Sequence, residues 1–219
     1  ELSALALKDE QNGVHTVEYE IPGKGIITEA TLCRVKNGIS ANYVEPYMRR
    51  RDPDSMLIGD KLPTDKTTYE KKFGSPFASL KKETFGWLEQ QDLAVFVFQA
   101  GQIDIGMYGL AIAPANAGFF CLGLGILQGI VDPNAFSSGT PVKCVLYTAP
   151  PFRHSHFDGK QVVVHERGDA VHEIFSYNLY PGPSAKKGVY SALLDFGERE
   201  GWVTAHASIV QVVTPYGNK

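Results

Sequence analysis

Three groups of residues have side chains that could bind an acidic ligand or take part in acid–base chemistry. They are the run Arg49–Arg51, Tyr180 with the lysines Lys186 and Lys187 that follow it, and His206. The planar guanidinium of arginine suits a carboxylate or a phosphate. Two lysines near the start of a helix are unfavourable, because the helix dipole places positive charge there. A nearby anion or metal ion would compensate for them.

Taken separately, each group also has a simpler explanation. Three consecutive arginines are most often a solvated surface, and a lone strand histidine usually donates a hydrogen bond to a neighbour. The evidence for a shared site is therefore the order and spacing of the groups along the chain.

This order resembles the amino-terminal half of ATP-dependent phosphoenolpyruvate carboxykinases. In that family the motif Gly-Arg-Ser-Pro-Lys-Asp-Lys precedes an apolar strand, and residues 50–58 resemble it, with Arg51 at the substrate-binding arginine. The family then has a tyrosine, a glycine-containing turn, Lys-Lys-Gly, an aromatic-Ser pair and a Gly-x-x-x-x-His strand. Tyr180, residues 186–191 and Gly201–His206 follow the same order, and Lys187 precedes His206 by the family's separation of 19 residues.

The resemblance implies a role for each matching residue. Lys187 and His206 would coordinate Mn²⁺ or Mg²⁺, Arg51 and Tyr180 would hold the carboxylates of oxaloacetate or phosphoenolpyruvate, and Lys186 would lie near the transferred phosphate. A lysine can bind a metal only as the neutral amine, which the charge of the ion favours. The implied activity is a metal-assisted phosphotransferase, or carboxykinase-like kinase, that acts on a small carboxylate.

The sequence departs from the family at three places. The turn after Tyr180 is one residue longer and lacks the family's glutamate, Met56 replaces the second lysine of the arginine motif, and Ala207 replaces the cysteine after the histidine. These changes fit a divergent, uncharacterised bacterial relative. They also leave open an alternative, a non-catalytic binding or structural domain that retains the fold but not the reaction.

No Gly-x-x-x-x-Gly-Lys-[Ser/Thr] phosphate-binding loop occurs in the chain. In the family that loop follows the histidine strand and belongs to a C-terminal P-loop domain, which also provides an aspartate as the third metal ligand. We therefore expect residues 1–219 to form one carboxykinase-like N-terminal domain, inactive alone. ATP or GTP would bind only in the full-length protein.

Hydrophobic patterns predict an α/β or α+β domain, with a mixed sheet and flanking helices. Predicted strands cover 26–36, 56–58, 93–98, 142–147 and 161–165, and 93–98 reads as a strand buried on both faces. A helix is expected at about 77–90. Another is expected after the cap Ser184, with apolar residues from Val189 to Phe196 at helical spacing and Gly197 and Gly201 near its end. A strand from Trp202 to Val213 would then carry His206.

Composition limits the other possibilities. A net charge of −3 and 43% hydrophobic residues predict a folded chain without affinity for nucleic acid. Three distant cysteines favour buried thiols in a reducing, cytoplasmic compartment. The uncharged stretch 105–131 is long enough to cross a membrane, but its proline and six glycines favour a buried strand, a turn and a short core helix. We expect no membrane association.

Two further groups of histidines could form a metal or catalytic site. His154 and His156 would share one face of a strand, but no third metal ligand lies nearby, so a surface loop is the favoured reading. The dipeptides His165-Glu166 and His172-Glu173 match no catalytic pattern.

Overall fold

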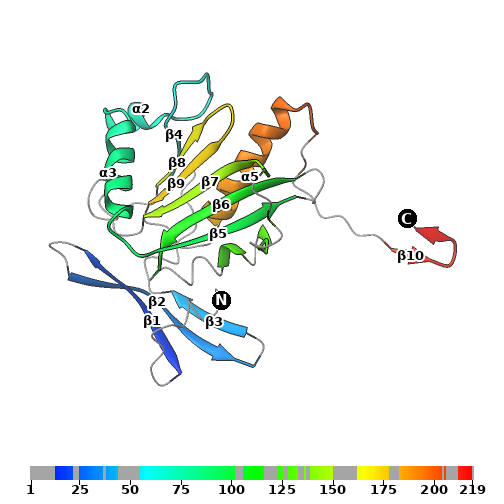
Figure 1. Ribbon diagram of the computed structural model, residues 1–219, viewed down its shortest axis with the longest axis horizontal. Helices are drawn as coiled ribbons and strands as arrows, with labels where there is room; N and C mark the ends of the chain where they lie inside the picture. The colour runs from blue at the N-terminus through cyan, green and yellow to red at the C-terminus, as the bar shows by residue number, and fades with distance from the viewer. Residues whose placement is uncertain are drawn as a thin grey trace.

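The computed structural model describes residues 13–21, 25–36, 38–43, 55–101, 106–115, 123–125, 128–132, 136, 139–149, 162–177, 183–203, 205 and 212–218. A six-stranded mixed sheet forms the centre, with helices on its faces (Figure 1). Its strands, in spatial order, are β4 (Met56–Ile58), β8 (Val162–Arg167), β9 (His172–Tyr177), β7 (Val142–Ala149), β6 (Met107–Pro114) and β5 (Leu93–Ala100). The predicted fold class, a mixed sheet with flanking helices, is confirmed.

Both kinds of strand pairing occur in this sheet. β4 with β8, β9 with β7, and β7 with β6 are parallel pairs, whereas β8 with β9 and β6 with β5 are antiparallel. The β8–β9 pair is a hairpin in the interior of the sheet. Successive side chains of this hairpin therefore point alternately into two packed layers, one on each face of the sheet.

One layer contains α5 (Pro183–Arg199) and part of a second sheet. The side chains of Val189, Ala192 and Phe196 pack on Val163 and Ile174 of the hairpin. The second sheet has the order β1 (Val14–Ile21), β2 (Gly25–Val35) and β3 (Gly38–Tyr43), all antiparallel. Its buried residues Val17, Ala30 and Leu32 belong to the same hydrophobic core.

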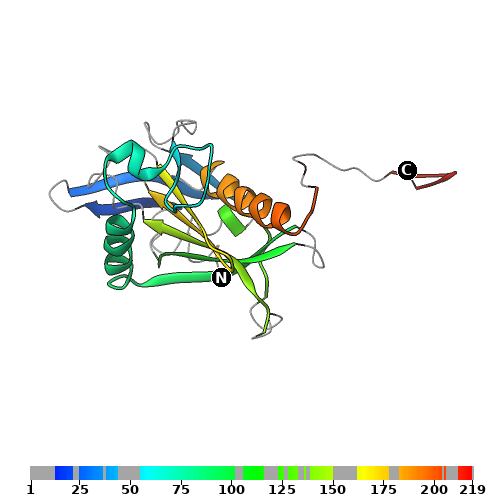
Figure 2. The same ribbon diagram turned by 90° about the horizontal axis from the view of Figure 1, so that it is seen from above.

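The other layer contains the short helix α2 (Tyr69–Phe73) and α3 (Ala78–Leu88). Tyr69, Phe77 and Leu80 pack on the opposite face of the hairpin, against Val164 and Phe175. In Figure 2, α3 (teal) and α5 (orange) are well separated from each other. The hairpin is thus enclosed between two helices, one on each face.

The ends of the helices follow from local chemistry. Thr68 caps α2, since its side chain accepts a hydrogen bond from the backbone of Lys71, and Gly74 ends α2 with φ 73°. Gly201, at φ 77°, follows α5 in a Schellman arrangement in which Trp202 N–H donates to Gly197 O. The predicted helix end near Gly197 and Gly201 is confirmed.

Two predictions differ from the structure, one at the start of α5 and one in the residues that follow α5. α5 begins at Pro183, so Ser184 lies inside the first turn and does not precede the helix; the fixed φ of proline suits that first position. Of the predicted strand from Trp202 to Val213, the described residues Trp202, Val203, Ala205 and Val212 are not in a strand, and Val213 is. A two-residue strand, β10 (Val213–Thr214), instead pairs with β11 (Gly217–Asn218).

The strand β5 is not buried on both faces as predicted. It is the last strand of the sheet, and its exposure alternates, with Phe96 and Phe98 buried and Leu93 and Val95 exposed. The continuous apolar run therefore forms a strand with only one face in the core. Residues 129–131 run along its outer edge, where Gln99 N–H donates to Gly129 O and Val131 N–H donates to Val97 O.

The uncharged stretch 105–131 contains the buried strand β6, as predicted, followed by helical residues at 123–125 with Leu124 in the core. Among the described residues, no helix is both long and apolar enough to cross a membrane.

Gly109 in β6 provides a test of packing at the sheet. It pairs with Phe98 of β5, and the buried Phe98 ring occupies the space that a side chain at 109 would need. Gly109→Ala should lower the free energy of unfolding by about 1–3 kcal/mol, because the ring cannot move out of a close-packed core. The shift of the urea midpoint at unchanged slope measures this.

The matched control is Gly86→Ala in α3. A Cβ at Gly86 meets no atom within 4 Å, so this substitution should stabilise the protein by about 0.5–1 kcal/mol through helix propensity. Equal effects of the two substitutions would contradict the packing at Gly109.

Candidate functional site

Of the five residues that the sequence assigns to a site, the structure describes one side chain, that of Lys187. Arg51, Tyr180 and His206 lie outside the described residues, and Lys186 is described only as backbone of α5. Lys187 is exposed on α5. The convergence of all five residues therefore remains a prediction.

The histidines His154 and His156 also lie outside the described residues. In the part of the chain that the structure describes, no three His, Cys, Asp or Glu side chains are grouped so that they could hold a metal ion.

Gly188 fixes the position of Lys187 relative to the sheet. A Cβ at Gly188 would lie 3.2 Å from Cγ2 of Ile174 and 3.6 Å from Cε1 of His165, so the helix backbone lies close against the hairpin. α5 then runs back along β9 towards His172, which contacts Asp195. Lys187 consequently lies on the half of α5 nearer the carboxyl end of β9.

The β8–β9 hairpin carries two polar clusters on opposite faces. Its register pairs Glu166 with Glu173, and places His165 and His172 one residue to either side of that pair. Because side chains alternate along a strand, the glutamates face α3 and the histidines face α5. The repeated His-Glu dipeptide thus produces two separate sites.

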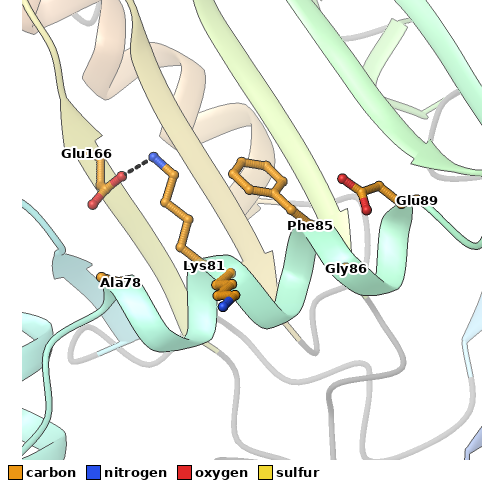
Figure 3. Close-up of a pocket in the computed structure, with 7 residues that line it drawn as sticks. Ala78, Lys81, Phe85, Gly86, Glu89 and Glu166 are labelled. Atoms are coloured by element: carbon orange, nitrogen blue, oxygen red, sulfur yellow. Dashed lines mark hydrogen bonds and ion pairs between the residues drawn. The ribbon is translucent and has the colours of Figure 1, made fainter.

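On the α3 face, Lys81 lies between the two glutamates. Its Nζ donates to Oε2 of Glu166 and to Oε2 of Glu173, each at 2.5 Å (Figure 3 shows the bond to Glu166). Like charges directly opposite each other in an antiparallel pair repel, and the ammonium group compensates for this. Partial burial opposes the charge of Lys81, but the two carboxylates outweigh it and raise the pKa of the ammonium group.

Aromatic rings surround this cluster. Lys81 Nζ lies 5.3 Å from the centre of the Phe175 ring, which stacks on Tyr147. The Tyr147 hydroxyl donates to Glu173 at 3.4 Å, and burial together with that carboxylate raises its pKa to about 12. Beside the cluster is an open hollow of about 630 Å³ along α3, lined by Ala78, Lys81, Lys82, Phe85, Gly86, Glu89 and Glu166 (Figure 3).

On the α5 face, three groups form a line. Nδ1 of His165 lies 2.9 Å from Nε2 of His172, and Nδ1 of His172 lies 3.3 Å from Oδ2 of Asp195. Both histidines are buried, with exposed fractions of 1% and 2%. Burial lowers the pKa of His172, although the nearby Asp195 carboxylate acts in the opposite direction.

Two arginines adjoin this line. Arg199 donates to the same oxygen of Asp195 at 2.8 Å, one helical turn along α5. Arg167 forms a two-pronged ion pair with Asp60, through Nη2 to Oδ1 at 2.7 Å and Nε to Oδ2 at 3.0 Å. Burial opposes ionisation of Asp60, but the hydrogen bonds and charge of Arg167, together with the hydrogen bond from the Leu62 backbone, outweigh it and lower the pKa of this carboxyl.

Sequence reasoning missed both clusters. The available signal was the repetition of His-Glu at positions 165 and 172 across a Gly168-Asp169 turn, which a hairpin with alternating faces turns into two pairs. The partners Lys81 and Asp195 come from helices elsewhere in the chain, and no local pattern indicates them.

The profile of a family described as "Domain of unknown function (DUF4914)" matches residues 1–219. No curated protein matches the chain.

Removing the cation from the α3 face should expose the repulsion between the glutamates. Lys81→Met should lower the free energy of unfolding by about 1–3 kcal/mol at pH 7.5, the range for an uncompensated, partly buried charge. The deficit should shrink as the pH rises above about 10.5, because the pKa of Lys81 is raised in the folded state and the unaltered protein loses the stabilising ammonium charge there. Urea denaturation at several pH values measures this.

Lys82→Met is the control, since Lys82 is the exposed neighbour on the same helix. It should change the stability by less than about 0.5 kcal/mol. A Lys81→Met deficit independent of pH would contradict the electrostatic explanation.

The α5 face should make folding sensitive to mild acid. Because the pKa of His172 is lowered in the folded state, the unfolded chain binds more protons once the pH falls below about 6.5. Stability should therefore be highest above that pH and decrease below it. In His172→Gln the decrease should be shallower, by at most about 1.4 kcal/mol per pH unit. Parallel curves for the two proteins would show that His172 does not contribute.

Proposed function

We propose that this chain, which belongs to the DUF4914 family, is the substrate-recognition domain of a nucleotide-dependent phosphotransferase. The enzyme would be assisted by a divalent metal ion and would act on a small carboxylate. The proposal rests on the resemblance to phosphoenolpyruvate carboxykinases in the order Tyr180, Lys186-Lys187-Gly188 and His206.

The observation that carries the proposal is the placement of Lys187. Its side chain is exposed, on the half of α5 nearer the carboxyl end of β9, and the adjacent Gly188 packs against Ile174. In α/β sheets ligands commonly bind at the carboxyl ends of strands. The close packing also gives a physical reason for glycine in the Lys-Lys-Gly motif, because a methyl group there would lie only 3.2 Å from Cγ2 of Ile174 and would require α5 or Ile174 to shift by a few tenths of an ångström.

Each residue of the proposed site has a chemical task. The Lys187 amine and the His206 imidazole would hold Mn²⁺ or Mg²⁺, and Lys186 would neutralise a phosphate. Arg51 and Tyr180 would hold the carboxylates of the substrate. The metal ion, when bound, would supply charge neutralisation. The nucleotide, ATP or GTP, would bind to a C-terminal P-loop domain of the full-length protein.

A second candidate, a non-catalytic binding or structural domain, is favoured by Met56. This residue stands where the family's arginine motif has a lysine, and it lies half-buried in β4, paired with Val163. A basic group at this point of the motif has been replaced by an apolar strand residue. The two candidates differ in whether the chain binds a metal ion.

Titration calorimetry of residues 1–219 with MnCl₂, with and without oxalate as a small dicarboxylate, tests the proposal. Lys187→Met and His206→Ala should each weaken Mn²⁺ binding by about tenfold or more, since each removes a ligand. Arg51→Gln should leave Mn²⁺ binding nearly unchanged but weaken the effect of oxalate.

Lys82→Met again serves as the control and should bind Mn²⁺ as the unaltered chain does. No detectable Mn²⁺ binding, or equal affinity in Lys187→Met and the unaltered chain, would favour the non-catalytic candidate.

A further inference from the structure

The line Asp195, His172 and His165 has a chemistry independent of the proposed function. Its two contacts, at 3.3 Å and 2.9 Å, join three titratable groups from α5, β9 and β8. An ionised carboxylate can only accept a hydrogen bond, so Nδ1 of His172 must carry the proton of the first contact.

That assignment determines the second contact. When His172 is neutral with its proton on Nδ1, its Nε2 holds a lone pair and can only accept. Nδ1 of His165 must then donate, and in neutral His165 the lone pair lies on Nε2. One arrangement of protons therefore satisfies both contacts, and it places the basic atom at the end of the line, on His165.

The same reasoning limits how many protons the line can bind. A proton added to Nε2 of His165 leaves every hydrogen bond intact, because Nδ1 still donates to His172 and His172 still donates to Asp195. A second proton would have to bind Nε2 of His172. Two N–H groups would then face each other across 2.9 Å, and the contact would be repulsive.

The charged groups around the line come from α5, β8 and the loop after β4. Asp195 provides a negative charge from α5 and also pairs with Arg199. Asp60, in the loop after β4, favours protonation of His172, and Arg167 of β8 opposes it. Cys144 of β7 is the register partner of His172, and burial raises the pKa of its thiol, so it stays neutral. Burial of both rings opposes more charge than the carboxylates can balance.

We propose that Asp195, His172 and His165 form a buried acid–base site that binds one proton, at Nε2 of His165, while His172 stays neutral as the bridge to Asp195. The first proton leaves α5 anchored to the hairpin. The second would set two N–H groups of β8 and β9 against each other within the hairpin, so it is disfavoured while the chain stays folded.

Nuclear magnetic resonance of the ring nitrogens in the ¹⁵N-labelled chain tests this from pH 8 to pH 5. His165→Gln and His172→Gln identify the two sets of signals. At pH 8 both rings should carry their proton on Nδ1. On acidification Nε2 of His165 should bind a proton, while the ring of His172 stays neutral for as long as the fold persists.

Asp195→Asn tests the counter-charge. The amide oxygen can still accept from His172, but the negative charge is removed, so the midpoint for His165 should fall by about one pH unit. Glu198→Gln removes an exposed charge from the same helix and should shift the midpoint by less than about 0.3 unit.

Three results would overturn the proposal. They are a proton on Nε2 of His165 at pH 8, protonation of His172 before or together with His165, and an unchanged midpoint in Asp195→Asn. Should Asp195→Asn fail to fold, the spectra of the unaltered chain still decide the first two. None of these results depends on Mn²⁺ binding, so the proposed function is judged separately.

Discussion

Glu166 and Glu173 can face each other across the β8–β9 hairpin because Lys81 lies between them. The packing of both helical layers depends on this compensation, since the hairpin contacts β4 and β7 in the sheet and the helices on its two faces. α3 is joined to it through Lys81, and α5 through the contact between His172 and Asp195. The hairpin is therefore the element through which a change on one face of the sheet would reach the other.

Much of the fold could be predicted from the sequence, because hydrophobic period and chain breakers are local signals. The strands at 56–58 and 142–147, and the helices at 78–88 and 183–199, lie where these signals place them. Exposure of β5 could not be predicted, since an apolar run does not show whether a neighbouring layer covers both faces. Trp202, Val203 and Ala205, the described residues at the start of another expected strand, are not in a strand, since an alternating pattern alone does not provide the partner that a ladder needs.

The candidate sites also differ in whether the sequence alone could reveal them. The motif around Lys187 was visible because its residues are close together and resemble a known order, and Gly188 gives that order a packing explanation. The clusters on the hairpin were not visible, since Lys81 is 92 residues from Glu173 and His172 is 23 residues from Asp195. Two His-Glu dipeptides acquire a meaning only once their strands are known to be antiparallel neighbours.

The segment 129–131 covers part of the outer edge of β5. Its backbone forms hydrogen bonds with Gln99 N–H and Val97 O, which β5 would otherwise present to solvent. The strand at the opposite border, β4, has only three residues. Unpaired borders are where β-rich proteins recruit strands from other molecules and aggregate. Covering part of one border and shortening the other opposes the addition of strands from further molecules.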